Sequence, residues 1–262
     1  MAKSYWQDRA AEAQTRLSNK RIEQIERQMT KYYAKTMRQV IADFEATYTH
    51  LYMTVEAGKE PTPADLYKLD KYWRLQAQCK EELERLGAKQ IAMLSNHFEK
   101  SWFDIYNSIN VEGAKAYSTM DTQAVRQMIN QIWCADGKNW SARIWQNTSQ
   151  LLDTLNEELI HTVAAGRRTT DLKNILQERF NVSYNRADSL VRTEIAHIQT
   201  QAAKQRYQDY GVEMVEIWAD KDERRCEHCG KLHQKKYPIN AHIPIPAHPK
   251  CRCCIVPVVE TD

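Results

Sequence analysis

Five of the seven cysteines of this chain lie within 29 residues near its C-terminal end, in a pattern typical of a metal site. Cys226-Glu-His-Cys229 is a C-x-x-C motif, and a loop rich in Pro and His separates it from His248-Pro-Lys-Cys251-Arg-Cys253. A C-x-x-C turn directs two thiolates to one ion, and an H-x-x-C or C-x-C about twenty residues later can complete a tetrahedron around Zn²⁺. The spacing therefore predicts a zinc site.

The preferred zinc ligands are both cysteines of the first motif with the histidine and the first cysteine of the second: Cys226, Cys229, His248 and Cys251. Cys253 competes for the fourth position, because residues two apart in a strand point the same way. His233 and His242 are weaker candidates. Four protein ligands leave no position for water, so the predicted zinc is structural rather than catalytic.

The alternative interpretation of these cysteines is a group of buried or disulfide-linked thiols. The start of the chain, Met1-Ala-Lys-Ser-Tyr-Trp, lacks the apolar core of a secretory signal peptide, which favours an intracellular, reducing environment and hence zinc. A segment this short cannot bury enough apolar surface to fold alone. We therefore expect metal binding to supply much of its folding free energy.

The overall composition predicts a soluble protein with no membrane partner. The chain has 262 residues, 42% of them hydrophobic, and its mean hydropathy is −0.70. No apolar run approaches the roughly 18 residues that a membrane-spanning helix needs. The charges, 37 Lys and Arg against 34 Asp and Glu, are too balanced for a dedicated polyanion-binding protein.

The cysteine-rich segment is nevertheless locally basic. Between Lys221 and Arg252 there are eight Lys or Arg and three Asp or Glu. This excess is compatible with contacts to DNA phosphates, with a solvated face, or with docking on an acidic protein. The candidate DNA contacts are the basic residues around the first cysteine motif: Arg224, Arg225, Lys235 and Lys236.

Helices are predicted to precede this segment. Apolar residues at steps of three or four predict one long helix over 4–57, with a period that favours a helical bundle over a dimeric coiled coil. Thr62 and Pro63 are predicted to open the next helix and Gly87 to end it, and the apolar and aromatic stripe of a further helix, 91–109, is expected in the core. The remaining helices are predicted to run from Asp121 to Gly137, from Ser141 to Gly166, from Thr170, and from an N-cap at Ser183 to Gly211.

After Gly211 the pattern changes to strands. Val212–Ala219 and Ile255–Val259 are predicted to pair in a small sheet around the cysteines, with Pro257 at an edge or an end. The fold class is thus mainly α: an elongated multi-helix N-terminal region, followed by a small C-terminal α+β zinc-binding module with a short β-sheet. The expected domains are a helical region 1–137, a second helical part 138–211 and the β/zinc module 212–262.

Arg192-Thr-Glu194, just before the module, offers a second candidate for chemistry. Glu194 and His197 share a helix face and could serve as an acid and a base, but no nucleophile, phosphate loop or second carboxylate lies near them in the sequence. A buried Arg192–Glu194 network is the better interpretation. Because residues two apart do not face each other on a helix, each needs a partner elsewhere, for instance in the metal module.

Several of these motifs occur together in one known family. The chain resembles the phage head-morphogenesis or minor head proteins, the Mu F-like group, over about 140–257, and the motifs that carry the likeness are Asn139-Trp-Ser-Ala-Arg143-Ile-Trp145, Leu190-Val-Arg-Thr-Glu194, Tyr207 to Gly211, Trp218, the C-x-x-C motif and His248-Pro-x-Cys251-Arg-Cys253. The family's Gly after C-x-x-C is present as Gly230. Its turn Gly before the Pro-rich loop is absent from Leu232-His-Gln234, which departs from the family's loop conformation.

The resemblance implies a non-enzymatic minor capsid protein of a tailed phage or prophage. Its implied partners are the portal protein, capsid or scaffold proteins and packaged DNA. Its implied location is the virion, in the capsid interior or portal region, after synthesis in the bacterial host cytoplasm. Two alternatives stay open. One is an HNH or treble-clef-like nuclease, because Ala241-His-Ile-Pro-Ile-Pro-Ala-His248 superficially resembles such sites, and the other is a DNA-binding module without catalysis.

Overall fold

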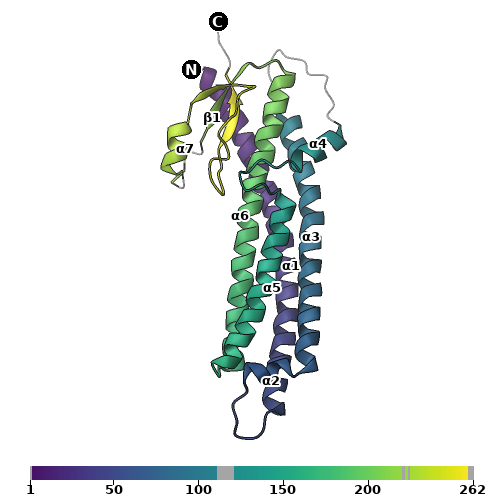
Figure 1. Cartoon of the computed structure of the whole chain (residues 1–262). Coiled ribbons are helices and arrows are strands. Elements are labelled where there is room, and N and C mark those ends of the chain that lie inside the picture. The colour runs from purple at the N-terminus through teal and green to yellow at the C-terminus, as the bar shows by residue number, and fades with distance from the viewer. Residues whose placement is uncertain (1, 111–120, 220–221, 224, 259–262) are drawn as a thin grey trace. The chain divides into compact units, whose positions relative to one another are not determined.

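The computed structural model describes residues 2–110, 121–219, 222–223 and 225–258 (Figure 1). Within them the chain is mainly helical and ends in a small sheet, which confirms the predicted fold class. The helices are α1 Ala2–Thr54, α2 Pro63–Tyr67, α3 Asp70–Ser108, α4 Thr122–Ile129, α5 Trp140–Ala164, α6 Thr169–Asp209 and α7 Glu227–Leu232. The strands are β1 Met214–Trp218, β2 Lys236–Pro238 and β3 Cys254–Pro257.

Two compact units are assembled from segments that are far apart in the sequence. The first unit comprises Met1–Ile25, Met93–Trp140 and Ser189–Asp262, and the second comprises Glu26–Ala92 and Ser141–Asp188. The long helices α1, α3 and α6 therefore contribute residues to both units. The division at 137 and 211 that follows the order of the chain stays a prediction.

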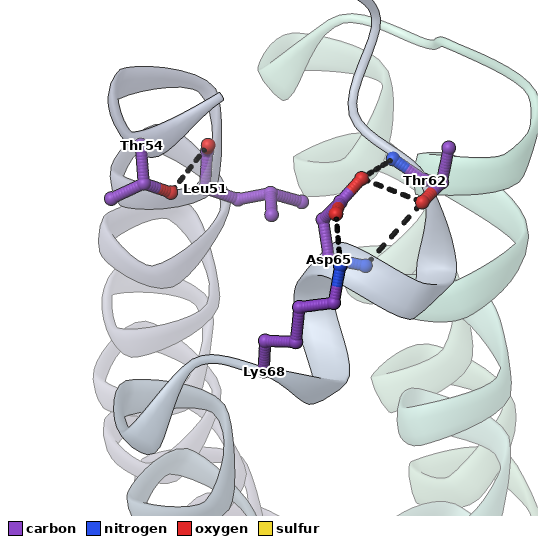
Figure 2. Close-up of polar contacts among 5 residues, drawn as sticks. All are labelled: Leu51, Thr54, Thr62, Asp65 and Lys68. Atoms are coloured by element: carbon purple, nitrogen blue, oxygen red, sulfur yellow. Dashed lines mark hydrogen bonds and ion pairs between the residues drawn. The ribbon is translucent and has the colours of Figure 1, made fainter. Parts of the chain in front are cut away.

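The second unit is a helical bundle with the apolar face of α1 inside. Met29, Phe44 and Leu51 are at most 1% exposed, as the helical period predicts for a bundle. Its short helix α2 is held by the predicted N-cap: Thr62 Oγ1 accepts the backbone N–H of Asp65, and Asp65 accepts the N–H of Thr62 (Figure 2). This reciprocal capping box satisfies backbone donors that the first helical turn leaves without partners.

The predicted helix end at Gly87 is wrong, because α3 continues through it. A Cβ atom at this position would lie 2.7 Å from Cζ3 of Trp145, so any larger residue here would have to displace the α5 indole ring. Gly87 therefore lies where two helices approach closely. Glycine lowers the intrinsic stability of the helix at this position, and the close contact offsets that loss.

The predicted helix start at Ser183 is also wrong, because Ser183 lies in the middle of α6. Its carbonyl and its hydroxyl oxygens both accept hydrogen bonds from Asn147 Nδ2, each at 3.0 Å. The Asn147 amide also lies 3.3 Å from the hydroxyl of Tyr33. Ser183 thus links helices of the second unit through a buried polar cluster instead of capping one of them.

In the first unit the sheet has the order β2-β1-β3, with both pairings antiparallel. Residues 212–219 and 255–259 were expected as strands. β1 occupies a shorter stretch of the first range, whereas β3 begins one residue before the second range, at Cys254, and ends at Pro257; Val259 lies outside the described residues. Pro257 is the last residue of the edge strand β3, opposite Val215, as its missing N–H requires. The three-residue strand β2 and the short helix α7 were not predicted.

Helices α1 and α6 both form hydrogen bonds to this sheet. From α1, Gln14 Nε2 donates to the carbonyl of Ile255 at 2.9 Å, and from α6 the hydroxyl of Tyr207 reaches the same oxygen at 3.4 Å. Figure 1 shows the first turns of α1 and the end of α6 beside β1. The aromatic stripe of α3 lies in the same unit's core, with Phe98 and Trp102 at most 1% exposed. The described helices include none with the length and apolarity needed to cross a membrane.

Candidate metal centre

The C-x-x-C motif forms the start of α7. Cys226 is the N-cap residue, and its sulfur accepts the backbone N–H of Cys229 at 3.3 Å. This arrangement turns both sulfur atoms toward one side of the helix start. Cys226 is exposed and Cys229 is buried, so the pair connects the surface with the interior of the first unit.

The second motif faces the first. His248 Nε2 lies 3.3 Å from the sulfur of Cys226 and 3.1 Å from that of Cys229, and the sulfurs of Cys229 and Cys251 are 3.8 Å apart. A turn in which the N–H of Cys251 donates to the carbonyl of His248 at 3.1 Å presents these two side chains together. The loop between the motifs is anchored to α6, where Lys204 Nζ donates to the carbonyl of Ala241 at 3.0 Å.

Four cysteines and one histidine of the two motifs form one cluster, and His228 is in neither of its groups. Two overlapping groups each have ligand atoms within 4.8 Å of one another: Cys226, Cys229 and His248 in one, and Cys229, Cys251 and Cys253 in the other. Both groups share Cys229. The cluster can therefore hold a metal ion, and which four residues bind it stays a prediction.

The donor atoms suit zinc. Thiolate sulfur and imidazole nitrogen are the usual ligands of structural Zn²⁺, and two thiolates at about 2.3 Å from a tetrahedral zinc are about 3.8 Å apart. The Cys229 and Cys251 sulfurs have that separation, at 3.8 Å. Neutral thiols are weak hydrogen-bonding partners, so this many of them in one cluster gains little from their mutual contacts alone.

The orientation of His248 also fits a ligand. Its Nδ1 is 2.8 Å from the carbonyl oxygen of Pro249, and a carbonyl can only accept, so Nδ1 carries the proton and Nε2 is left with its lone pair toward the sulfurs. Such a backbone hydrogen bond fixes the tautomer that binds metal through Nε2. The same carbonyl contact raises the pKa of His248.

The thiols differ in acidity. The backbone N–H of Cys229 lowers the pKa of Cys226, whereas burial raises the pKa of Cys229 to about 12. A hydrogen bond from the Cys253 thiol lowers the pKa of Cys251 to about 5, and the same contact raises the pKa of Cys253. Protons are thus retained on part of the cluster at neutral pH, and binding of zinc as thiolates must release them.

The two weaker histidine candidates lie outside both groups among the described residues. His233 Nδ1 accepts the backbone N–H of Ala219 at 3.3 Å, and its ring lies edge-on to Trp218, 5.7 Å between centroids. His242 is exposed on the loop. His233 therefore contributes to the local structure beside β1, and His242 lies at the surface.

The Arg192-Thr193-Glu194 motif contacts two other elements. Glu194 is 1% exposed and accepts the indole N–H of Trp133 at 3.0 Å, and that indole stacks on His197 at 4.1 Å. Thr193 Oγ1 accepts the backbone N–H of Lys250, in the metal loop, at 3.1 Å. From the sequence we singled out Arg192 and Glu194 and missed Thr193 and Trp133. The signal that could have found Thr193 is a hydroxyl between two charged residues on the helix before the module.

The candidate DNA contacts lie at the surface where they are described. Arg225, Lys235 and Lys236 are exposed, and Arg224 lies outside the described residues. The neighbouring Arg252 is engaged in a two-pronged ion pair with Asp222, at 2.6 and 2.5 Å. The free charge of this face is therefore smaller than the sequence count implies.

Comparison with known families identifies the part of the chain that carries this centre. Residues 153–256 match the family described as Phage Mu protein F like protein, which confirms the resemblance read from the sequence over the second half of α5, α6 and the cysteine module. The motif Asn139–Trp145 lies outside the matched residues. No curated protein and no solved structure matches the chain.

Proposed function

We propose that this chain is a minor capsid protein of a tailed phage or prophage that acts in head assembly. The observation that carries the proposal is the Mu F-like match over 153–256, which spans α6 and every residue of the cysteine–histidine cluster. A structural role accounts for a unit in which four cysteines and one histidine are gathered in one thiol-rich centre. In this role the protein bridges the portal and other head components inside the virion, after synthesis in the bacterial host cytoplasm.

Exposed aromatic rings of the second unit support a protein-binding role for the helices. Trp73 is 57% exposed and Tyr67 43%, and their rings stack with centroids 6.2 Å apart. Trp145, in the family-like motif at the start of α5, is 42% exposed. Large aromatic side chains that remain accessible in a folded chain are the type that dominates protein interfaces. Portal, capsid or scaffold subunits are the partners we propose for these exposed rings.

Pull-down with the portal protein of the same genome tests the assembly role. The full chain should be retained by portal and should be present in purified particles. A Trp73→Ser, Tyr67→Ser variant should lose portal retention while its circular dichroism matches the parent, because both rings are already accessible to water. Absence of the full chain from particles, together with no binding to portal or capsid subunits, would overturn the proposal.

The metal centre is proposed to be a structural zinc site. Cys226, Cys229 and His248 supply three ligands, and either Cys251 or Cys253 supplies the fourth. Four protein donors close the coordination sphere, which supports a stabilising rather than a catalytic ion. Elemental analysis of the purified protein should find about one zinc per chain.

A nuclease and a DNA-binding module are the alternative functions. A nuclease would cleave plasmid DNA in the presence of Mg²⁺, so a cleavage assay distinguishes it from an assembly protein. Exposed Arg225, Lys235 and Lys236 support at most a weak phosphate contact with packaged DNA, and such binding should fall steeply as salt is raised. Cleavage that requires Mg²⁺ and is lost with His248→Ala would favour the nuclease instead.

A further inference from the structure

The turn between the second pair of candidate ligands contains an unusual backbone conformation. Lys250, between His248 and Cys251, has φ of 61°, in the left-handed region that non-glycine residues rarely occupy. This conformation lets the chain reverse within His248-Pro-Lys-Cys251 so that the imidazole and the thiol meet. A residue held in this region needs surrounding contacts to keep it there.

One such contact comes from α6, far from the loop in sequence. The backbone N–H of Lys250 donates to Thr193 Oγ1 at 3.1 Å. The Thr193 hydroxyl donates its own proton to the carbonyl of Ser189, one helical turn earlier, at 2.7 Å. Because its single proton is used within the helix, the hydroxyl presents a lone pair to the loop.

We infer that Thr193 is a positioning residue of the metal centre: it fixes the left-handed turn at Lys250 and thereby the angle between His248 and Cys251. The inference rests on the proposed zinc site and assigns to it a contact in the helical half of the first unit. It also gives the Arg192-Thr193-Glu194 segment a contact with the metal loop, through Thr193. Groups that orient metal ligands commonly change metal affinity about 10- to 100-fold when removed.

Thr193→Val tests the inference, because valine has the shape of threonine and cannot accept the hydrogen bond. Zinc affinity, measured by competition with a chromophoric chelator, should fall about 10-fold, at the lower end of the range because the contact is exposed to water. Thr193→Ser keeps the hydroxyl and should restore most of the affinity. The visible absorption of the Co²⁺-substituted protein should change in Thr193→Val, since it reports ligand geometry.

Thr200→Val is the matched control. Thr200 lies on the same helix, and its hydroxyl donates to the carbonyl of Ala196 at 2.8 Å, the same local bond that Thr193 makes. No hydrogen bond from Thr200 to the metal loop is found among the described residues. Its substitution should leave zinc affinity and the Co²⁺ spectrum unchanged, whatever it does to helix stability.

A second variant tests the backbone strain directly. Lys250→Gly retains the N–H and adopts positive φ without strain, so in this background Thr193→Val should weaken zinc binding less than in the parent. Unchanged zinc affinity in Thr193→Val, or an equal loss in Thr200→Val, would overturn the inference. The zinc proposal itself fails separately, if the parent protein binds no zinc.

Discussion

Gln14 of α1 and Ile255 of β3 are joined by a buried hydrogen bond, from the side-chain amide to the backbone carbonyl, at 2.9 Å. The two residues are 241 positions apart, and the bond satisfies a carbonyl on the outer edge of the sheet. An edge strand left open is a site for unwanted pairing, and covering it with a helix removes that risk. The N-terminal helix is thus part of the cysteine module's structure.

Gln14→Leu should therefore destabilise the first unit. The loss is expected to be about 1 kcal/mol, because the Ile255 carbonyl keeps only the longer contact from Tyr207, at 3.4 Å. Urea unfolding of the parent and the variant would measure it. Gln39→Leu is the control, since the side-chain hydrogen bonds of Gln39 found among the described residues go to Asp43, on an exposed part of α1; a similar loss there would show that the effect is not due to the sheet edge.

Gly87→Ala should destabilise the protein although alanine is the better helix former. Helix propensity alone predicts a gain of about 1 kcal/mol, but the new Cβ would lie 2.7 Å from the Trp145 ring. Overpacking of this kind costs about 1–3 kcal/mol. Thermal unfolding should show a lower Tm for Gly87→Ala in the parent and a smaller loss, or a gain, in a Trp145→Ala background.

Gly87 and Ser183 illustrate which parts of the fold local sequence signals can predict. The apolar periodicity of α1, the cap at Thr62 and the cysteine spacing each depend on neighbours in the chain, and the structure has the corresponding elements. Gly87 and Ser183 carry the same residue types as helix ends, but their partners, Trp145 and Asn147, come from another helix. Contacts with another helix determine whether such a residue caps a helix or packs against its neighbour. The residues around it in the sequence do not indicate those contacts.

The candidate site divides in the same way. Spacing located both ligand motifs, whereas the contact of Thr193 with Lys250 depends on how the loop folds back on α6. Strand β2 has only three residues, too few for a periodic pattern, and is defined by its pairing with β1. Its existence follows from the register of the sheet rather than from its own composition.

Removal of the metal should unfold the cysteine module while much of the helical signal remains. Cys229→Ser should cause the same loss, because Cys229 belongs to both metal-capable groups, and far-ultraviolet circular dichroism should change little. The measurement is Tm with and without a zinc chelator. Cys254→Ser is the matched control, since Cys254 is in neither group found among the described residues; a parent protein whose Tm ignores the chelator would contradict a stapling role.

Acid should destabilise the first unit through His197. Burial lowers the pKa of His197 to about 4 in the folded protein, below the roughly 6.5 expected for an unfolded chain. The unfolded state therefore binds more protons between these values, and the stability that the neutral ring provides is complete above about pH 6.5 and lost as pH falls toward 4. His97, whose pKa burial also lowers to about 4, adds to the same trend.

His197→Phe isolates this contribution, because phenylalanine keeps a ring beside Trp133 and has no proton to bind. The variant should lose less free energy of unfolding than the parent when pH falls from 7 to 5, by about 1 kcal/mol once solvent screening is allowed for. Urea unfolding of both proteins at each pH gives this difference, and acid release of the metal cancels because it affects both. Equal losses in the two proteins would show that His197 is not protonated on unfolding in this range.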